Sequence, residues 1–216
     1  MIEAPSHARL PNGWRYLPRN TIGSLLAAGH VVEDEYILLC DPDMVFTGQL
    51  AYPRTFAAEF YDYIKYSDPV ATQLLQKTCL TASINDLDKE YRIGVPYLIY
   101  TRDCMRVARR WQAVMDLYEA PKWVELMYAY GIALKLENIG MTTTHIMVSN
   151  YNQGQVCERP LIHYCYGDST WNKRMFIKEG HSPVQQQWNL GAIPKGTVLY
   201  ELLRQVQEAQ AFFRVV

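Results

Sequence analysis

Two carboxylates, Asp41 and Asp43, stand one residue apart directly after the apolar run 36–40. Such a run predicts a strand covered on both faces, and in open α/β sheets ligands lie just beyond the carboxyl ends of strands. Pro42 cannot donate to a strand ladder, so pairing should stop there and both side chains can face one region. Mg²⁺ and Mn²⁺ prefer such oxygen ligands. The motif therefore predicts a metal that binds a phosphate ester, although it is also typical of a turn.

One chemistry that uses this pair is phosphate hydrolysis. Residues 41–45 fit the pattern Asp, any residue, Asp, any residue, Thr or Val, and so resemble the haloacid dehalogenase superfamily. Asp41 would then be a phosphorylated nucleophile and Asp43 its acid/base partner. Such enzymes need another acidic group late in the chain to complete a Mg²⁺ site. No aspartate follows Asp168 and the late glutamates do not cluster, so this alternative is the less favoured one.

A second chemistry is glycosyl transfer, in which an Asp, any residue, Asp motif (DXD) holds a divalent ion against the diphosphate of a nucleotide sugar. A late histidine commonly adds a ligand, and His163 in the apolar segment 161–167 is the candidate. A histidine satisfied within the core would explain the same pattern. Because leaving-group departure is the hard step, catalysis should depend on a Lewis-acidic metal at the diphosphate, helped by Lys173. Lys173 could equally be surface charge.

Size and composition indicate one soluble domain over residues 1–216. The chain is 49% hydrophobic and 20% charged, enough for one sizeable core. A net charge of −1 gives no case for nucleic acid or an anionic membrane as the main partner. No apolar span of membrane length and no signal peptide is visible. Five cysteines without metal-type pairing indicate free thiols in a reducing compartment, so we expect a cytoplasmic protein.

Local patterns predict the elements before residue 101. Residues 1–18 are expected to be irregular, and a helix should begin near residue 20 and end at Gly29. Apolar residues recur at helical spacing over 55–66 and should belong to the core. The polar stretch 67–92 is expected to be a mobile loop or an acceptor-facing insertion. A strand is predicted at 93–100, where Gly94 would allow either a close ligand approach or a bulge.

The second half of the chain alternates helices and strands. Asp103 is expected to cap a helix that ends near residue 118, with its arginines mostly on a solvated face. Helical spacing also predicts a helix over 122–138, with Trp123 on its apolar face. Strands are expected at 145–148, where His145 should be structural, and at 161–167. A final amphipathic helix is predicted at 197–213.

Four segments then resemble a known family: 35–46 (EYILLCDPDMVF), 93–98 (IGVPYL), 123–133 (WVELMYAYGIA) and 162–167 (IHYCYG). In this order they resemble the plant and algal hydroxyproline O-arabinosyltransferase and peptidyl serine α-galactosyltransferase group. The resemblance implies an α/β fold of the GT-A type, Rossmann-like, with a mixed sheet flanked by helices. It also implies a UDP-sugar-dependent transferase that retains anomeric configuration. Mn²⁺ or Mg²⁺ would be bound by Asp41, Asp43 and His163.

One departure from the family concerns an acid in the third segment. Family members usually carry it directly before a methionine, where this chain has Leu126, and the acid here is Glu125. A shift of one residue rotates a helical side chain by about 100°. Glu125 is therefore expected to be either a catalytic or acceptor-side residue, or a solvated helix acid.

A second departure is the short N-terminal half. A GT-A domain opens with a strand, a helix and a further strand that build much of the nucleotide pocket, whereas one helix is expected before Tyr36. We therefore expect a minimal version of the fold. Arg19 and Asn20 at a helix start could hold the nucleotide or simply cap the helix. Alternatively a second copy or a partner chain completes the pocket, or donor binding is impaired and the protein binds a nucleotide sugar or glycan without turnover.

The sequence as a whole predicts a glycosyltransferase that moves glucose or galactose from UDP to a hydroxyl acceptor, either a peptide serine or hydroxyproline or a glycan. Pro42, Gly94, Pro96 and Lys173 are expected on the donor side, together with the helix-start pair at 19–20. The absence of a visible membrane anchor is compatible with a microbial or viral cytoplasmic enzyme.

Overall fold

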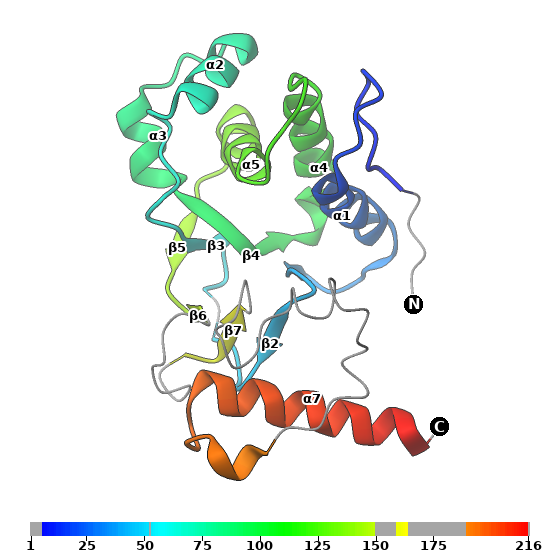
Figure 1. Cartoon of the computed structure of the whole chain (residues 1–216). Helices are drawn as coiled ribbons and strands as arrows, with labels where there is room; N and C mark the ends of the chain where they lie inside the picture. Colours follow the sequence, from blue (N-terminus) through cyan, green and yellow to red (C-terminus); the bar gives the residue numbers. More distant parts are fainter. Residues whose placement is uncertain (1–5, 52, 150–158, 164–188, 216) are drawn as a thin grey trace. The chain divides into compact units, whose positions relative to one another are not determined.

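The computed structural model describes residues 6–51, 53–149, 159–163 and 189–215. The chain divides into two compact units. Unit 1 consists of Met1–Cys40 and Tyr52–Thr144, and unit 2 consists of Asp41–Ala51 and His145–Val216. Each unit contains its own sheet (Figure 1).

The sheet of unit 1 has four strands in the order β1-β4-β3-β5. They are β1 (Tyr36–Leu39), β3 (Ala57–Phe60), β4 (Ile93–Tyr100) and β5 (Thr142–Thr144). Strand β4 is antiparallel to both β1 and β3, while β5 is parallel to β3, so the sheet is mixed. Strand β4 is buried over all but its last residue, which explains why its sequence is almost continuously apolar.

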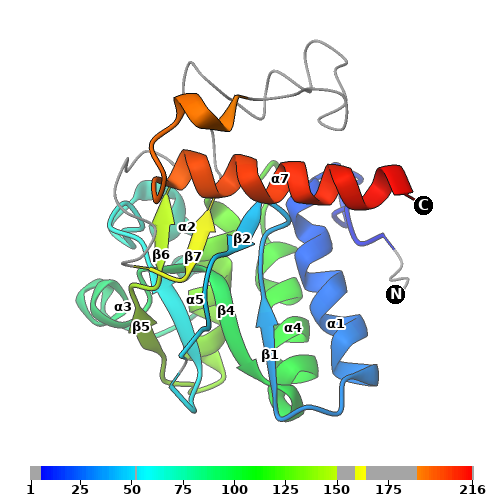
Figure 2. The same ribbon diagram turned by 90° about the horizontal axis from the view of Figure 1, so that it is seen from below.

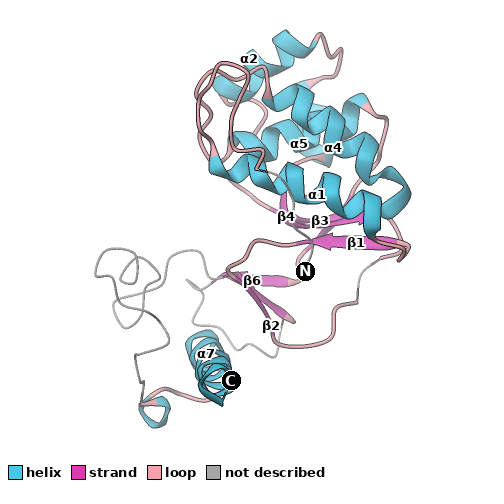
Figure 3. Cartoon of the chain, turned by 90° about the vertical axis from the view of Figure 1, so that its right-hand side faces the viewer, coloured by secondary structure: helices cyan, strands magenta, loops and turns pink. Residues whose placement is uncertain are grey.

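Three helices cover one face of this sheet. Helices α1, α4 and α5 lie side by side in Figure 2, and Figure 3 shows them on the same face of the strands of unit 1. Two shorter helices, α2 and α3, connect β3 to β4. The helical elements of unit 1 are η1 (Leu17–Arg19), α1 (Asn20–Val31), α2 (Pro69–Thr78), α3 (Ile84–Glu90), α4 (Thr101–Met115) and α5 (Glu125–Leu136).

An aromatic cluster joins the helices to the sheet at the centre of unit 1. The ring of Trp111 on α4 lies 5.8 Å from that of Tyr97 on β4 and 4.7 Å from that of Tyr130 on α5. Tyr97 and Tyr130 are 4.0 Å apart, and all three side chains are fully buried. The indole nitrogen of Trp111 donates to the carbonyl of Leu126 at 2.9 Å. Large buried rings supply much of the apolar area that such a core removes from water.

Several predictions for unit 1 are confirmed. Strand 93–100 has the expected bounds, and α1, α4 and α5 occur where helices were expected. Helical spacing in this segment predicts an apolar stripe of Val107, Ala108, Trp111, Val114, Met115 and Tyr118. The first five are buried in α4, and Tyr118 lies beyond the end of the helix.

Two predicted segments are wrong in type. The stretch 55–66 contains strand β3 rather than a helix, although its Phe56, Tyr61 and Ile64 do lie in the core. A short run of apolar residues cannot separate the two periods, and pairing with β4 on one side and β5 on the other decided the outcome. The stretch 67–92 is not a loop but forms α2 and α3. Asp68 and Ser83 cap them by accepting the backbone N–H of Val70 at 2.8 Å and of Asp86 at 3.0 Å.

Other boundaries also differ from the expectations. Strand β1 is half-buried rather than covered on both faces, because it lies at the edge of the described sheet, next to β4. Helix α1 continues past Gly29, whose missing side chain allows α4 to approach closely; a Cβ there would lie 3.1 Å from that of Cys104. Asp103 lies inside α4 instead of capping it, and Trp123 is exposed rather than part of the apolar face of α5.

Unit 2 contains a three-stranded sheet and a long helix. The sheet has the order β2-β7-β6, with β2 (Met44–Phe46) antiparallel and β6 (Met147–Ser149) parallel to β7 (Leu161–His163). The 3-10 turn η4 (Leu190–Ala192) precedes α7 (Val198–Val215), the predicted C-terminal helix. Helix α7 lies alongside the strands of unit 2 in Figure 1.

Apolar contacts hold α7 to this sheet. Leu202 and Leu203 are buried and Val45 of β2 packs against them, while Val198 packs with Ile162 of β7. The side-chain amide of Gln205 donates to the carbonyl of Phe46 at 2.9 Å. Thr197 caps the helix, since its hydroxyl accepts the N–H of Tyr200 at 3.3 Å.

The structure confirms a mixed α/β fold with a mixed sheet and flanking helices, while GT-A topology and a single glycosyltransferase domain stay predictions. Strand 145–148 was predicted slightly early, since β6 begins at Met147. The part of 161–167 after His163 lies outside the described residues. None of the helices in the described part of the chain combines the length and apolarity that a bilayer crossing requires.

Candidate metal site and the predicted donor residues

The Asp-Pro-Asp motif forms a tight turn at the start of β2. The carbonyl of Asp41 accepts the N–H of Met44 at 3.1 Å, which closes a four-residue turn with Pro42 in its second position. Proline is favoured there because its fixed φ is already that of a turn. The motif therefore forms a turn, as its composition predicts, and this turn is also compatible with metal binding by its two aspartates. Asp41 and Asp43 stand at the first and third positions of this turn.

Strand pairing brings His163 to this turn. His163 is the last residue of β7 and lies opposite Met44, the residue that follows Asp43. Its Nε2 atom is 3.4 Å from Oδ1 of Asp43 and 3.7 Å from Oδ2 of Asp41. One ligand atom from each of the three residues lies within 4.8 Å of the others. The imidazole is buried and the carboxylates are half-buried, so it is the carboxylates that solvent reaches.

The donor set fits a divalent cation. Ligand atoms that each stand about 2.0 to 2.2 Å from one ion are separated from each other by roughly 3 to 4 Å, similar to the spacing here. Two carboxylates and one imidazole suit Mn²⁺, Mg²⁺ and Zn²⁺. Three protein ligands would leave coordination positions for oxygen atoms of a substrate. Without an ion, the same groups can form a charge-assisted contact when the imidazole is protonated.

Glu125 is buried rather than solvated. Its side chain accepts the backbone N–H of Lys122, and the residue is 4% exposed at the first position of α5. The interpretation as a solvated helix acid is therefore wrong. Burial raises the pKa of Glu125, and the Lys122 N–H and charge oppose that shift. Burial together with the charge of Glu125 also raises the pKa of Tyr16 and of Tyr118. Its predicted catalytic role stays a prediction.

Arg19 and Asn20 are both engaged within unit 1. The Arg19 guanidinium is buried, forms an ion pair with Asp116 and donates to the carbonyl of His7 at 2.9 Å. The Asn20 side chain accepts the N–H of His7, also at 2.9 Å. These bonds attach the N-terminal segment to the start of α1. A contribution of either residue to nucleotide binding stays a prediction.

The remaining donor-side residues occupy different environments. Gly94 and Pro96 are buried in β4, and the space beside Gly94 is filled by the ring of Tyr61, with which a Cβ would collide at 2.5 Å. The group that approaches Gly94 closely is thus the Tyr61 side chain and not a ligand. Pro42 is exposed on its turn, and Lys173 lies outside the described residues.

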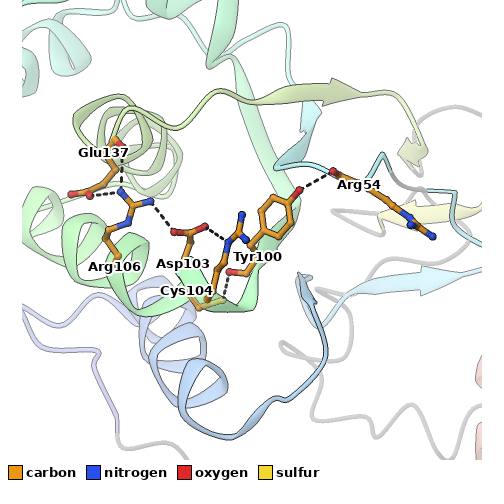
Figure 4. A network of polar contacts seen from close by, with 7 residues as sticks. Arg54, Tyr100, Asp103, Cys104, Arg106 and Glu137 are labelled. Atoms are coloured by element: carbon orange, nitrogen blue, oxygen red, sulfur yellow. Dashed lines mark hydrogen bonds and ion pairs between the residues drawn. The ribbon is translucent and has the colours of Figure 1, made fainter.

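The exposed side of α4 is held by ion pairs. Arg106 contacts Asp103 at 2.8 Å and Glu137 at 3.2 Å, and Arg110 contacts Glu137 at 2.6 Å. Figure 4 shows how Arg106 lies between the two acids. This confirms the expected solvated face. Cys104, also in Figure 4, donates to the carbonyl of Tyr100, and burial raises the pKa of its thiol to about 12.

Sequence reasoning missed a buried acid in the sheet of unit 1. Glu59 is buried at the end of β3 and accepts the hydroxyl of Thr144 at 3.0 Å. A β-bulge in the pairing with β4 lies between Ala58 and Glu59. Bulges often re-aim a side chain. A glutamate within the apolar run 56–61 was the available signal, and the helical interpretation of that run concealed it.

The protein thus has a mixed α/β fold in which a turn places two aspartates beside a histidine. Such a set of side chains is suited to metal-assisted transfer from phosphate esters. Residues 17–144 match the family model described as the hydroxyproline O-arabinosyltransferase family N-terminal domain. The match spans more than half of the chain, so the chain belongs to this family and is by class a glycosyltransferase. The range includes Asp41 and Asp43 and ends before His163. Neither the curated proteins nor the solved structures gave a match.

Proposed function

We propose that this protein is a divalent-metal-dependent glycosyltransferase that moves a hexose, glucose or galactose, from a UDP-sugar to a hydroxyl group. The observation that carries the proposal is the gathering of Asp41, Asp43 and His163, whose ligand atoms lie within 4.8 Å of one another although the histidine is far away in the sequence. Family membership independently supports glycosyl transfer and weighs against the phosphatase alternative.

Each of the three side chains has a distinct part in the proposal. His163 and Asp43 would bind Mn²⁺ or Mg²⁺ directly, and Asp41 would do so directly or through a ribose hydroxyl and water. When bound, the ion would neutralise charge that develops on the departing diphosphate. The turn closed by the Met44 N–H fixes the spacing of the two carboxylates before a donor arrives. Pre-set geometry of this kind lowers the entropy that binding must overcome.

For the donor and acceptor, the proposal follows the predictions made from the sequence. Lys173 would contact the diphosphate, and Arg19 with Asn20 would contact the nucleotide. A second copy or another chain would complete the nucleotide pocket if these residues do not suffice. Retention of configuration is carried over from the family resemblance. The acceptor hydroxyl would belong to a peptide serine or hydroxyproline or to a glycan.

The test is UDP release from UDP-glucose, UDP-galactose and a UDP-arabinose, measured with Mn²⁺, with Mg²⁺ and with chelator. Asp43→Ala should abolish metal-dependent release while the circular dichroism spectrum stays unchanged, because one ligand of the ion is lost. Asp34→Ala, which removes an exposed acid a few residues earlier, is the matched control. Full activity of Asp43→Ala would refute the site. Saturable metal-dependent donor binding without UDP release from any donor would instead identify a nucleotide-sugar-binding protein.

A further inference from the structure

Two exposed aromatic side chains of unit 1 lie in contact although they are far apart in the sequence. Tyr63 is 46% exposed and Trp123 is 52% exposed, and their rings meet edge to face, with centroids 5.7 Å apart and planes at 61°. Tyr63 follows β3, whereas Trp123 stands just before α5. Large apolar side chains exposed together form a surface that a ligand could cover.

The ring of Tyr63 packs against a buried ring, that of Tyr61. The ring of Tyr61 lies 5.3 Å from that of Tyr63, and its hydroxyl donates to the carbonyl of Val95 at 2.9 Å. Tyr61 is itself buried against Gly94, where any side chain would displace it. The glycine of β4 therefore makes room for the ring that supports Tyr63.

The Trp123 side is fixed through its backbone. The Tyr16 hydroxyl donates to the carbonyls of Lys122, at 2.8 Å, and of Trp123, at 3.3 Å. Glu125 accepts the N–H of Lys122 from the other direction. Both peptide groups around Trp123 are thus held by buried side chains. A backbone that is fixed in advance reduces the conformational entropy lost when a ligand binds.

The neighbouring side chains indicate what kind of ligand fits. Asp62 and Lys65 flank Tyr63 in the sequence, Lys122 precedes Trp123, and all three are exposed. Charges of both signs do not select a strongly anionic or cationic ligand, but they offer hydrogen-bond donors and acceptors. Two rings also supply far less than the roughly 800 Å² per partner of a stable protein interface. A small neutral ligand with apolar faces and many hydroxyls satisfies these conditions.

We propose that Tyr63 and Trp123, with ring planes inclined at 61°, form an angled stacking platform for a neutral saccharide. The faces of aromatic rings carry negative potential, which attracts the weakly positive C–H groups on the face of a pyranose ring, and stacking removes apolar surface of both partners from water. The sugar hydroxyls would then meet the flanking acid and lysines. That the bound saccharide is the acceptor rests on the proposed transferase function; the binding itself does not.

The test is titration of the full chain, without donor or metal, with neutral hexasaccharides of β-1,4-glucose, β-1,4-mannose, β-1,4-galactose and α-1,4-glucose. Calorimetry and tryptophan fluorescence would follow binding. At least one saccharide should bind, and Trp123→Ala and Tyr63→Ala should each weaken it about tenfold, equivalent to about 1.4 kcal/mol. Tyr63→Phe keeps the ring and should keep most of the affinity. Trp14→Ala removes an indole that is 53% exposed elsewhere in unit 1 and should leave binding unchanged.

Three results would overturn the platform: no binding of any hexasaccharide, equal loss in Trp14→Ala, or binding at these rings of a hydroxyproline-rich peptide in place of the saccharides. Thermal unfolding of each variant separates a lost contact from a lost fold. If the alanine variants unfold, retained affinity in Tyr63→Phe supports the platform and lost affinity contradicts it. Asp43→Ala should bind the saccharide normally. Failure of the metal site and failure of the platform are therefore distinguishable, because each can occur while the other persists.

Discussion

Unit 1 and unit 2 differ in how much of their structure is held by buried apolar contacts. Unit 1 has helices packed on a sheet whose central strand is buried over seven of its eight residues. In its described residues, unit 2 has three strands of three residues each, and the apolar contacts of Val45 and Ile162 are with α7. The candidate metal ligands nevertheless belong to unit 2. The difference shows that the described part of unit 1 is held by a continuous apolar core, while β2 and β7 of unit 2 would gain stability from an ion that joins them.

The largest expected effect concerns the core of unit 1. Trp111→Ala should lower the free energy of unfolding by about 3 to 5 kcal/mol, because it empties a fully buried site between α4, α5 and β4. Chemical denaturation followed by far-ultraviolet circular dichroism would measure this loss. Trp14→Ala, at an exposed indole, should change stability by no more than about 0.5 kcal/mol. Similar losses in both variants would contradict the contrast between core and surface.

The next effect concerns unit 2. Mn²⁺ at about one hundred times its dissociation constant should stabilise the protein by about 2.7 kcal/mol, because the ion binds only the folded site. Thermal shift with and without chelator would measure it. His163→Ala and Asp43→Ala should remove the shift, whereas Asp34→Ala should retain it. An unchanged shift in His163→Ala would place the ion elsewhere.

A smaller effect is expected where Glu125 holds the start of α5. Glu125→Ala should cost about 0.5 to 1.5 kcal/mol, the usual net contribution of an intramolecular hydrogen bond, because the N–H of Lys122 loses its acceptor. Glu125→Gln keeps an acceptor and removes the buried charge, so it should be more stable than Glu125→Ala.

Comparing the pH dependence of stability in the wild type and in Glu125→Gln gives the sign of the pKa shift of Glu125. Since the pKa of Glu125 is raised in the folded state, that state binds the proton more tightly than the unfolded chain does. The stability that protonated Glu125 contributes is therefore fully present below pH 4.5, the ordinary pKa of a glutamate. It is lost as the pH rises through the higher pKa of the folded state. Unfolding measured across this window should show the wild type losing stability relative to Glu125→Gln. A gain with rising pH would show that the shift has the opposite sign.

The smallest effect concerns the ion pairs on α4. Arg110→Gln should cost only about 0.2 to 1 kcal/mol, because its partner Glu137 keeps Arg106 and the arginines are half exposed. The cost should shrink in 1 M salt, where such pairs are screened. Arg109→Gln, at an exposed neighbour, is the charge-matched control. A loss of several kcal/mol would mean that this network contributes as much as core packing.

Local signals in the sequence predicted much of this fold, and long-range pairing decided the rest. Strand 93–100 and the helix predicted from Asp103 to about residue 118, observed at 101–115, were readable because their apolar patterns are long. Strand β3 was missed because its four residues show no clear period and are specified by their neighbours on both sides. The caps at Asp68 and Ser83 were readable signals for α2 and α3, but the polar character of 67–92 favoured a loop.

The candidate site shows the same limits. The acidic pair was visible as a local motif, and its proximity to His163 followed from chemistry and family resemblance before the strand register placed them together. The burial of Glu125 and Glu59 was not predictable, because each depends on contacts from distant segments. The Tyr63 and Trp123 pair was missed for the same reason, since Trp123 was assigned to the core.

The pairing of Met44 with His163 makes the candidate metal site sensitive to insertions and deletions. Side chains alternate between the faces of a strand, so a slip of one residue between β2 and β7 would place Ile162 beside the turn and turn the imidazole to the opposite face. A one-residue insertion between Pro160 and His163 would therefore separate the three ligands without changing any of them. By contrast, an insertion at the exposed Gly13 turn of unit 1 would leave that register intact. Gain or loss of a single codon in β7 is thus expected to inactivate the protein more completely than many substitutions.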